Sequence, residues 1–375
     1  MRQRIHSLDI IRIAATFAII VFHWNIYAYH YGIDAEPVFH LPFATGTAAV
    51  PAVSLFFILS GASLMLSCRK NFTLKGYFLR RFLSIYPLYW LAYAVVFFHV
   101  YVLRHVPMDK PLITLPLSFL AMDGLLADTL NTWYLIGEWF VGCIVLLYLV
   151  FPLLRLAVKK APGFSLLGGL LLAFLLTRVP AFPIDATHFP LTRVPEMLLG
   201  MVYVEIFYPD KGSRPPFVRV LGRFFGTRAE AGAAESEAFC APASKYVFRR
   251  ILLAAAALAA GLLPAFVCVN LPETLLPLLM GGGIFTGLEL LLSLALPKGR
   301  RFALLSAASG MTYGIFLVHH IYVGEFLGKY LGGDLPYGKN LLLFAVYLVF
   351  VTVLGSILTW ISGKLVSLIR RKKRP

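Results

Sequence analysis

The amino-acid sequence predicts an all-α integral membrane protein with about ten transmembrane helices and with both termini on the cytoplasmic side. Two observations lead to this prediction. Hydrophobic residues make up 59% of the 375-residue chain and charged residues only 14%, whereas soluble domains contain roughly 25% charged residues. The apolar residues also recur in runs of around 20, about the length that a helix needs to cross ~30 Å of hydrocarbon. A soluble globular domain is therefore excluded.

The candidate spans lie, in chain order, at about 8–29, 48–67, 82–104, 132–154, 163–178, 191–207, 250–270, 274–296, 302–328 and 340–363. The first span follows basic residues, as the core of a signal peptide does, but it is longer and lacks a small-residue cleavage pattern. We therefore expect it to be retained in the membrane. A further apolar stretch, 112–130, is interrupted by Pro116, Asp123, Gly124 and Asp128.

The basic residues between the spans predict the topology. With a cytoplasmic N-terminus and ten spans, the basic segments 68–81, 155–160, 211–250 and 298–301 and the tail 370–374 all fall on the cytoplasmic side, as the positive-inside rule requires. Counting 112–130 as a full span would place several of them outside. We therefore expect 112–130 to be re-entrant or to lie along the outer surface. The net charge of +16 is accounted for by topology, and nucleic acid is not an expected partner.

One long segment separates the spans, at 208–249. It is rich in Arg, Gly, Ala and Pro and has little apolar periodicity, so we expect a basic, partly disordered cytoplasmic loop within a single membrane domain that covers 1–375. The four cysteines form no CxxC pair, and no close ligand pair such as HxxxH is present, so no metal site is expected.

The first span contains two ionisable residues that are costly to bury in a membrane, Arg12 and His23. They are separated by about 1100° of helix rotation, which is three turns plus ~20°, so they share a face about 16 Å apart along the axis. Asp9 precedes Arg12 by one turn and can pair with it. A plain alternative is that Arg12 snorkels to the interface while His23 is a satisfied polar group.

Two further spans contain polar groups at a similar depth. Glu138, His319 and His23 all lie roughly 6–8 Å to the outer side of their span centres, at about 1.5 Å per residue. Arg12, Arg80 and Arg81 instead lie toward the cytoplasmic side. This layout indicates an anionic ligand that enters from inside and proton chemistry nearer the outside. His320 points about 100° away from His319 on a helix and is treated as secondary.

Six short motifs follow one another along the chain. They are Arg12 with ten residues and then His23, the segment Phe56–Gly61 (FFILSG), the segment Arg80–Pro87 (RRFLSIYP), the segment Trp133–Glu138 (WYLIGE), the segment Arg193–Glu196 followed by Gly200, and the segment Tyr313–His319 (YGIFLVH). Their order and spacing, from about residue 5 to 365, resemble those of the membrane-bound acyltransferase family 3, the glycan O-acyltransferases.

The chain departs from the family pattern at two places. Ser84 stands where the family often has Arg, so Arg80 and Arg81 must supply any anion contact there. Val53, Ser54 and Leu55 precede the FFILSG segment, where many relatives have an acidic residue. No extracellular hydrolase-like domain, which some relatives append, is expected after the last span.

The resemblance implies transfer of an acyl group, usually acetyl, from acyl-coenzyme A to a hydroxyl of an extracytoplasmic carbohydrate. Acyl-CoA is then a co-substrate, and no tightly bound cofactor is expected. Arginine suits the phosphates of coenzyme A, because it binds them bidentately, so Arg12, Arg80 and Arg81 are the expected donor-binding residues. His23 is the expected general base, since imidazole titrates near neutral pH.

The remaining motif residues have expected supporting roles. Glu138 or His319 orients His23 or relays its proton. Ser60 and Tyr313 are candidates for hydrogen bonding or oxyanion support, although helix packing accounts for them equally well. Asp9, Arg193 and Glu196 complete the expected site.

Two other classes of function stay open at this point. A transporter or flippase would use the buried Arg, His and Glu as a proton or substrate path, and a scaffold of envelope assembly would use them for structure alone. The expected location is a bacterial cytoplasmic membrane, with the lipid bilayer, acyl-CoA, a carbohydrate acceptor at the outer face and envelope-assembly proteins as partners. The sequence does not identify the acceptor or distinguish acetyl from succinyl.

Overall fold

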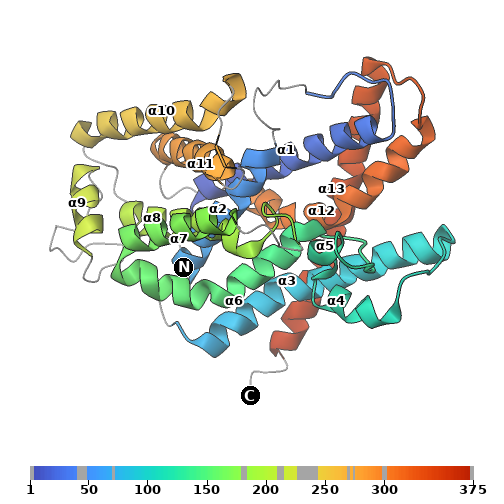
Figure 1. Ribbon diagram of the computed structural model, residues 1–375, viewed down its shortest axis with the longest axis horizontal. Helices are drawn as coiled ribbons and strands as arrows, with labels where there is room; N and C mark the ends of the chain where they lie inside the picture. Colours follow the sequence, from blue (N-terminus) through green and yellow to red (C-terminus); the bar gives the residue numbers. More distant parts are fainter. Residues whose placement is uncertain are drawn as a thin grey trace. The chain divides into compact units, whose positions relative to one another are not determined.

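The computed structural model describes residues 4–39, 49–69, 72–178, 184–208, 215–225, 244–267, 271–272, 275–297 and 302–371. Over these residues the chain is helical, and its only β-type pairing in them is one bridge between Asp34 and Asp334 (Figure 1). The predicted all-α class is confirmed. The helices are, in chain order, α1 (His6–His30), α2 (Ala49–Ser67), α3 (Leu74–Phe97), η1 (Phe98–Leu103), η2 (Leu112–Thr114), α4 (Leu115–Phe119), α5 (Asp123–Leu126), α6 (Glu138–Lys160), α7 (Pro162–Leu176), η3 (Pro190–Arg193), α8 (Val194–Phe207), α9 (Pro216–Phe224), α10 (Ser244–Phe266), α11 (Leu275–Ala295), α12 (Ala303–Leu327), η4 (Gly328–Tyr330) and α13 (Tyr337–Arg371).

Eight helices in the described part of the chain are long and apolar enough to cross a membrane. They correspond to α1, α2, α3 with η1, α6, α10, α11, α12 with η4, and α13. The other two predicted spans, 163–178 and 191–207, are also helical, but α7 has 15 residues and α8 has 14. At about 1.5 Å per residue they extend only ~22 Å and ~21 Å. The count of ten spans and the cytoplasmic termini stay predictions.

The interrupted stretch 112–130 forms three short helices, η2, α4 and α5, of which the longest has five residues. None of them can cross a bilayer, as the sequence led us to expect. Within the predicted loop 208–249, the structure describes the helix α9 and the start of α10, which begins at Ser244 rather than at 250 as predicted. Residues 209–214 and 226–243 lie outside the described residues.

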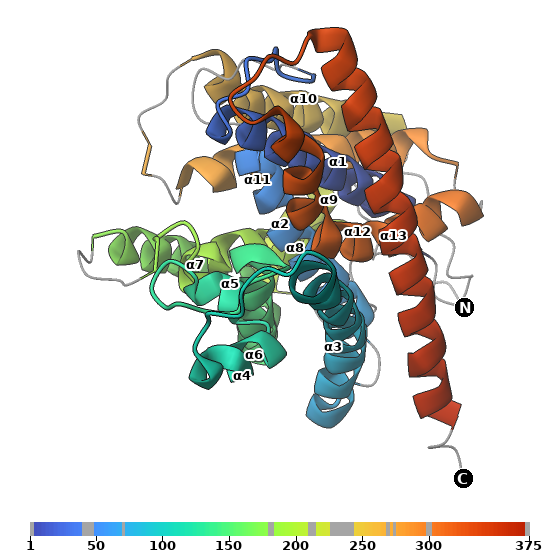
Figure 2. The same cartoon turned by 90° about the vertical axis from the view of Figure 1, so that its right-hand side faces the viewer.

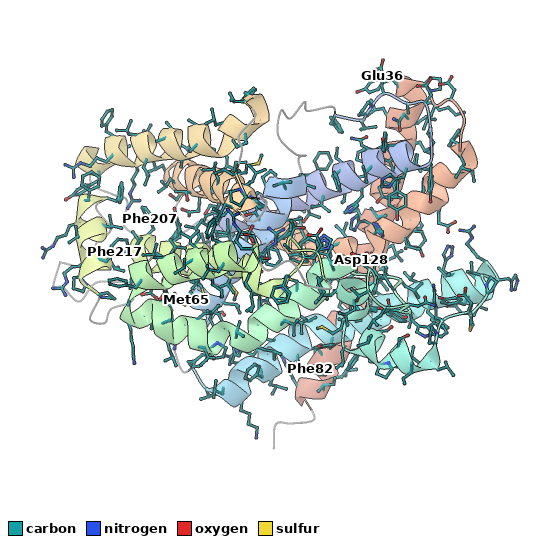
Figure 3. All side chains as sticks on the ribbon, in the orientation of Figure 1. Glu36, Met65, Phe82, Asp128, Phe207 and Phe217 are labelled. Carbon is teal, nitrogen blue, oxygen red and sulfur yellow. The ribbon has the colours of Figure 1, made fainter. Side chains whose placement is uncertain are left out.

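Large apolar side chains remain exposed on many of the helices. Phe82 on α3 and Phe217 on α9 are examples that Figure 3 labels, and Phe164 on α7 is 81% exposed. In water such residues would favour association, but hydrocarbon chains solvate them as well as a protein core does. The exposed apolar side chains therefore fit a multi-pass membrane protein.

The chain divides into two compact units. The first comprises Met1–Ala15, Phe43–Phe72 and Leu147–Ser306, and the second comprises Thr16–Pro42, Thr73–Leu146 and Ala307–Pro375. Helix α1 is continuous from His6 to His30, so Arg12 and His23 stand on one helix as predicted, although they belong to different units.

In the first unit, α2 packs against α8 and α11, and α10 lies beside α11 (Figure 1). The crossing of α2 and α8 depends on two glycines. A Cβ atom placed on Gly61 would lie 2.0 Å from the carbonyl oxygen of Met197, and one on Gly200 would lie 1.9 Å from that of Ile58. Since no side chain fits at these distances, the two backbones touch directly. Small residues permit such close crossings in membrane proteins.

In the second unit, α3 and the long helix α13 pack together (Figure 2). The segment that follows α1 is fixed to the turn before α13, because the amide of Asp34 donates to the carbonyl of Gly333 and the amide of Leu335 donates to the carbonyl of Asp34. Trp24 on α1 donates from Nε1 to Oδ1 of Asn340 on α13, at 2.8 Å. These contacts hold the C-terminal half of α1 against α13.

The short-helix segment of the second unit is built around Asp123, which is 1% exposed. Its carboxylate accepts hydrogen bonds from the hydroxyl of Tyr89 at 3.1 Å and from the amide of Gly124 at 3.0 Å, and its carbonyl accepts one from Thr132. Burial raises the pKa of Asp123 from 3.8 to about 6, against the opposing effect of these hydrogen bonds and of one from Ser118.

We expect the raised pKa of Asp123 to make folding stability depend on pH. A carboxyl group whose folded-state pKa lies above its unfolded value stabilises the folded state fully below about pH 4. This contribution to the free energy of unfolding is lost as the pH rises through about 6. The loss amounts to at most about 3 kcal/mol. Thermal unfolding in nanodiscs should therefore show a midpoint that falls between pH 4.5 and 7.5, and Asp123→Asn should remove that part of the fall. An equal fall in both proteins would contradict the prediction.

Candidate functional site

Two histidines that are 296 residues apart in sequence meet in the second unit. Nδ1 of His23 on α1 lies 3.0 Å from Nε2 of His319 on α12, and their ring centroids are 4.9 Å apart. His319 is 0% and His23 8% exposed. The sequence predicted only that the two residues share a depth, and the structure brings them into hydrogen-bond contact.

The hydrogen bonds of His319 fix the direction in which the pair donates. The carbonyl oxygen of Phe316 lies 2.6 Å from Nδ1 of His319, and a carbonyl only accepts, so this nitrogen bears a proton. When His319 is neutral, its Nε2 accepts the hydrogen bond and Nδ1 of His23 donates it. A neutral His23 then has its lone pair on Nε2, which is the form that a general base requires.

Neighbouring groups hold His319 in place. The hydroxyl of Tyr347 on α13 donates to the carbonyl oxygen of His319 at 2.9 Å. Phe316 lies against the His319 ring at 5.3 Å between centroids, and Phe140 lies against Phe316 at 5.4 Å. Tyr347 and the Phe316 carbonyl were not among the predicted residues. A short motif of mostly apolar residues does not show which backbone carbonyl lies against the His319 ring.

His320, which we treated as secondary, also contacts His23. Its ring meets the His23 ring edge-on at 5.1 Å between centroids, and it is partly exposed whereas His319 is buried. Nε2 of His320 lies 3.1 Å from the hydroxyl of Tyr27, one turn after His23 on α1. The ring of Tyr134 lies 6.3 Å away. The 100° between His319 and His320 therefore does not remove His320 from the site, because His23 lies between the two directions.

Two other predicted residues belong to the same unit. Glu138 is the first residue of α6, so the prediction that it lies inside a helix beginning at 132 was wrong. Its side chain lies outside what the structure describes. Tyr313 stands on α12, two turns before His320, and its hydroxyl is buried. The roles of Glu138 in orienting His23 and of Tyr313 in supporting an oxyanion stay predictions.

Arg12 lies in the first unit, where it shares Asp9 with a second arginine. Arg4 forms two hydrogen bonds to the Asp9 carboxylate, at 2.7 Å and 2.9 Å, whereas Nη1 of Arg12 lies 3.4 Å from Oδ1. Nη2 of Arg12 donates to Oγ of Ser63 at 3.1 Å. The predicted Asp9–Arg12 pair is present, but one carboxylate faces two guanidinium groups. These three groups together carry a formal charge of +1, and an excess of positive charge attracts anions.

Arg80 and Arg81 lie in the second unit, near the start of α3. Arg80 is exposed and Arg81 is partly buried. Thr73 caps this helix, since its hydroxyl accepts a hydrogen bond from the amide of Gly76. Binding of one ligand by all three arginines stays a prediction.

The remaining predicted residues hold the first unit together. Nη1 of Arg193 lies 3.1 Å from Oε1 of Glu196, with both side chains buried, and Nε of Arg193 donates to the carbonyl oxygen of Thr187 at 2.7 Å. Tyr148 on α6 donates to Oγ of Ser60 on α2 at 3.4 Å. A buried ion pair is stable only when further hydrogen bonds satisfy its charged groups. Arg193 has such a bond, to Thr187, so the Arg193–Glu196 pair can stabilise the start of α8.

One buried acid of the first unit was missed from the sequence. Glu289 on α11 is 1% exposed, and its carboxylate accepts hydrogen bonds from the hydroxyls of Ser7, Tyr203 and Tyr208. The rule that an ionisable residue within a span marks a site applies to Glu289 as it does to Arg12. Through Ser7, this carboxylate fixes the turn of α1 that precedes Asp9 and Arg12.

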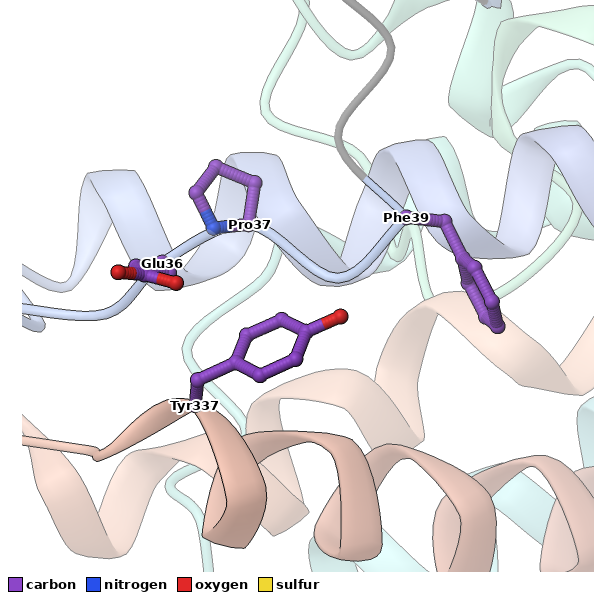
Figure 4. Close-up of a pocket in the computed structure, with 4 residues that line it drawn as sticks. All are labelled: Glu36, Pro37, Phe39 and Tyr337. Atoms are coloured by element: carbon purple, nitrogen blue, oxygen red, sulfur yellow. The ribbon is translucent and has the colours of Figure 1, made fainter.

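A shallow pocket of about 470 Å³ opens in the second unit, beside the loop that follows α1. It is lined by Glu36, Pro37, Phe39 and Tyr337 (Figure 4). Asn340 holds this loop by donating to the carbonyl of Glu36. None of the predicted site residues is among the four that line the pocket. The loop meets α1 through Asn25 and through the contact of Phe39 with Phe17.

Comparison with known proteins gives one family and one curated relative. A family model described as an acyltransferase domain matches residues 5–361. Acyltransferase MdmB from Streptomyces mycarofaciens is 25% identical to the chain over 296 residues, which cover 77% of the chain and 72% of that relative. No solved structure matches the chain. The matched range includes every predicted site residue, from Asp9 to His319.

Proposed function

The chain belongs to this acyltransferase family, and from that premise we propose that it transfers an acyl group, in the first place acetyl, from cytoplasmic acyl-CoA to a hydroxyl of an extracytoplasmic carbohydrate. It is a multi-pass membrane acyltransferase. The donor, the acetyl group, the carbohydrate acceptor and a bacterial cytoplasmic membrane are the proposed refinements of that statement. The bacterial origin of the relative MdmB supports the last of them.

The observation that supports the proposal best is the chain of two hydrogen bonds through His319, one to the carbonyl oxygen of Phe316 and the other to Nδ1 of His23. A sugar hydroxyl is a weak nucleophile, and a base at Nε2 of His23 removes its proton while the oxygen attacks the thioester carbonyl. The C–O bond forms, and the C–S bond then breaks. The departing coenzyme A thiolate takes the proton back from His23, so the products are an ester and a free thiol.

His319 contributes to this cycle by stabilising the charge on His23. Once protonated, the His23 ring donates from Nδ1 to Nε2 of His319, which remains neutral because its own proton is held on the Phe316 carbonyl. A buried, oriented acceptor of this kind stabilises an imidazolium without moving during the reaction. In this mechanism His23 is both base and acid, and His319 is a positioning residue.

The donor's phosphates are assigned to the positive region around Arg12. Arg12→Ala is expected to raise the KM for acetyl-CoA by about 10- to 100-fold, the effect of losing a charge-assisted hydrogen bond of roughly 1.5–3 kcal/mol. Acetyl-pantetheine lacks the nucleotide phosphates, so with this donor the variant and the wild type should have nearly equal KM values. Steady-state kinetics in nanodiscs measures both.

An arginine of the same unit serves as the control for Arg12. Arg178 is exposed and lies over the ring of Phe174 at 5.0 Å, so Arg178→Ala should leave both donors unaffected. An Arg12→Ala protein with an unchanged KM for acetyl-CoA would rule out the phosphate contact.

The proposed function is tested by the fate of the thioester. The purified protein in nanodiscs should release free thiol from acetyl-CoA in the presence of a carbohydrate acceptor, and cells that lack the protein should lose O-acyl groups from an envelope glycan, as mass spectrometry can detect. A transporter or flippase instead moves an unmodified solute and releases no thiol.

A further inference from the structure

The two neighbouring histidines of α12 meet His23 from environments of different polarity. His319 is fully buried and bonded to a backbone carbonyl, whereas His320 is partly exposed and bonded to a side-chain hydroxyl, that of Tyr27. His319 thus faces the protein interior and is fixed in one tautomer. Of the two histidines, His320 is the one that retains accessible surface beside His23.

The contacts of His320 join amphipathic aromatic residues. Tyr27 meets the His320 ring edge-on at 5.1 Å between centroids and meets Tyr31 at 5.5 Å, and Tyr134 lies on another side of His320 at 6.3 Å. All of these side chains are partly exposed. Ligand sites combine aromatic walls with a few placed polar groups, and a tyrosine supplies both in one side chain.

This composition suits a sugar ring better than an acyl chain or a phosphate. A pyranose has apolar C–H faces, which pack on aromatic rings, and a rim of hydroxyl groups. The Tyr27 hydroxyl can donate to an unprotonated nitrogen of His320 while its oxygen still accepts from a ligand hydroxyl. The described residues named here contribute no formal charge when His320 is neutral, so they offer an anion little attraction.

The position of the pair relative to His23 supports the same assignment. The rings of His23 and His320 are 5.1 Å apart between centroids, so the ring of a sugar whose hydroxyl bonds to His23 can reach His320 and its partner Tyr27. We propose, on the basis of the acyl-transfer function above, that Tyr27 and His320 form a subsite that binds the sugar ring of the acceptor and selects which hydroxyl reaches His23.

The test compares conservative variants with matched controls in the nanodisc assay. The acceptor probes are the methyl glycosides of glucose, galactose and N-acetylglucosamine, with acetyl-CoA as donor. Tyr27→Phe removes one hydroxyl, and His320→Phe keeps a ring against His23 but removes both nitrogens. Each should raise the acceptor KM about fivefold to tenfold, the effect of about one neutral hydrogen bond, and should change the KM for acetyl-CoA less than twofold.

The controls lie on the same helix and outside the site. Tyr29 is 77% exposed and His30 follows it in the last turn of α1, so Tyr29→Phe and His30→Phe should retain both KM values. The glucoside and the galactoside differ in the configuration of one hydroxyl. The ratio of their rates should move closer to one in Tyr27→Phe but stay as in the wild type in Tyr29→Phe.

Three results would overturn the assignment. One is an unchanged acceptor KM in both site variants, and another is an equal rise in the KM values of acceptor and acetyl-CoA, which indicates a general disturbance of the site. The third is a wild-type protein that releases no thiol with any probe. This last result rejects the proposed function together with the subsite, whereas the first two reject the subsite alone.

Discussion

Replacing His23 with alanine is expected to reduce acyl transfer by about 10²- to 10⁴-fold, the usual contribution of a positioned general acid–base group. The reason is that Nε2 of His23 is the nitrogen left to accept a proton once the bonds from Phe316 to His319 to His23 are set. The rate of thiol release at saturating acetyl-CoA and acceptor measures the loss. The KM for acetyl-CoA should change little.

A double substitution distinguishes a positioning role of His319 from an independent one. If His319 acts only through His23, the single variant His23→Ala and the double variant His23→Ala/His319→Phe should have the same residual rate. The reason is that substitutions of residues that act together are not additive. His30→Ala, in the exposed last turn of α1, is the control for folding and insertion. A folded His23→Ala protein with full activity would disprove the assignment of His23 as the base.

Substituting valine for Gly200 is expected to prevent folding of the first unit. The first atom of any side chain at this position would lie 1.9 Å from the carbonyl oxygen of Ile58 on α2, and a backbone atom cannot move aside as a flexible side chain can. The helices α2 and α8 would have to separate, which costs more than the roughly 4–5 kcal/mol that marks an exceptional substitution. Fluorescence-detected size exclusion of the solubilised protein should show loss of the monodisperse peak.

A glycine in open space provides the control for Gly200. A Cβ on Gly168 of α7 would meet nothing within 4 Å among the described residues, so Gly168→Val should give a normal elution profile. Of the milder alanine variants, Gly200→Ala should have a lower thermal unfolding midpoint than Gly168→Ala. Equal midpoints for the two alanine variants would show that α2 and α8 do not cross as closely as described.

The sequence predicted the long helices well, because a run of apolar residues that must span hydrocarbon has few alternatives to a helix. The helix repeat also placed Arg12 and His23 on one helix, and the interruptions at Pro116 and Gly124 marked a stretch that forms only short helices. Some boundaries were predicted wrongly: α3 begins at Leu74 rather than at 82, and α6 begins at Glu138 rather than at 132.

Contacts between helices could not be read from the sequence. Span depth indicated that His23 and His319 lie at one level, but their 3.0 Å contact depends on the packing of α1 and α12. His320 was set aside because its direction on α12 differs from that of His319, an argument that fails when the partner ring lies between both directions. Glu289 was overlooked although the rule for buried charges covers it, and its three hydroxyl partners come from α1, α8 and the residue that follows α8.

The group that orients the histidine pair is the main-chain carbonyl of Phe316, where a serine-hydrolase triad uses a carboxylate. A carbonyl has no proton to gain, so acidification cannot release the ring that it holds. It also belongs to the backbone of a helix and is therefore present whatever residue occupies position 316. The acceptor that orients the pair is thus supplied by the helix itself, and a substitution at position 316 that leaves α12 intact removes the packing of Phe316 against the His319 ring but keeps this hydrogen bond.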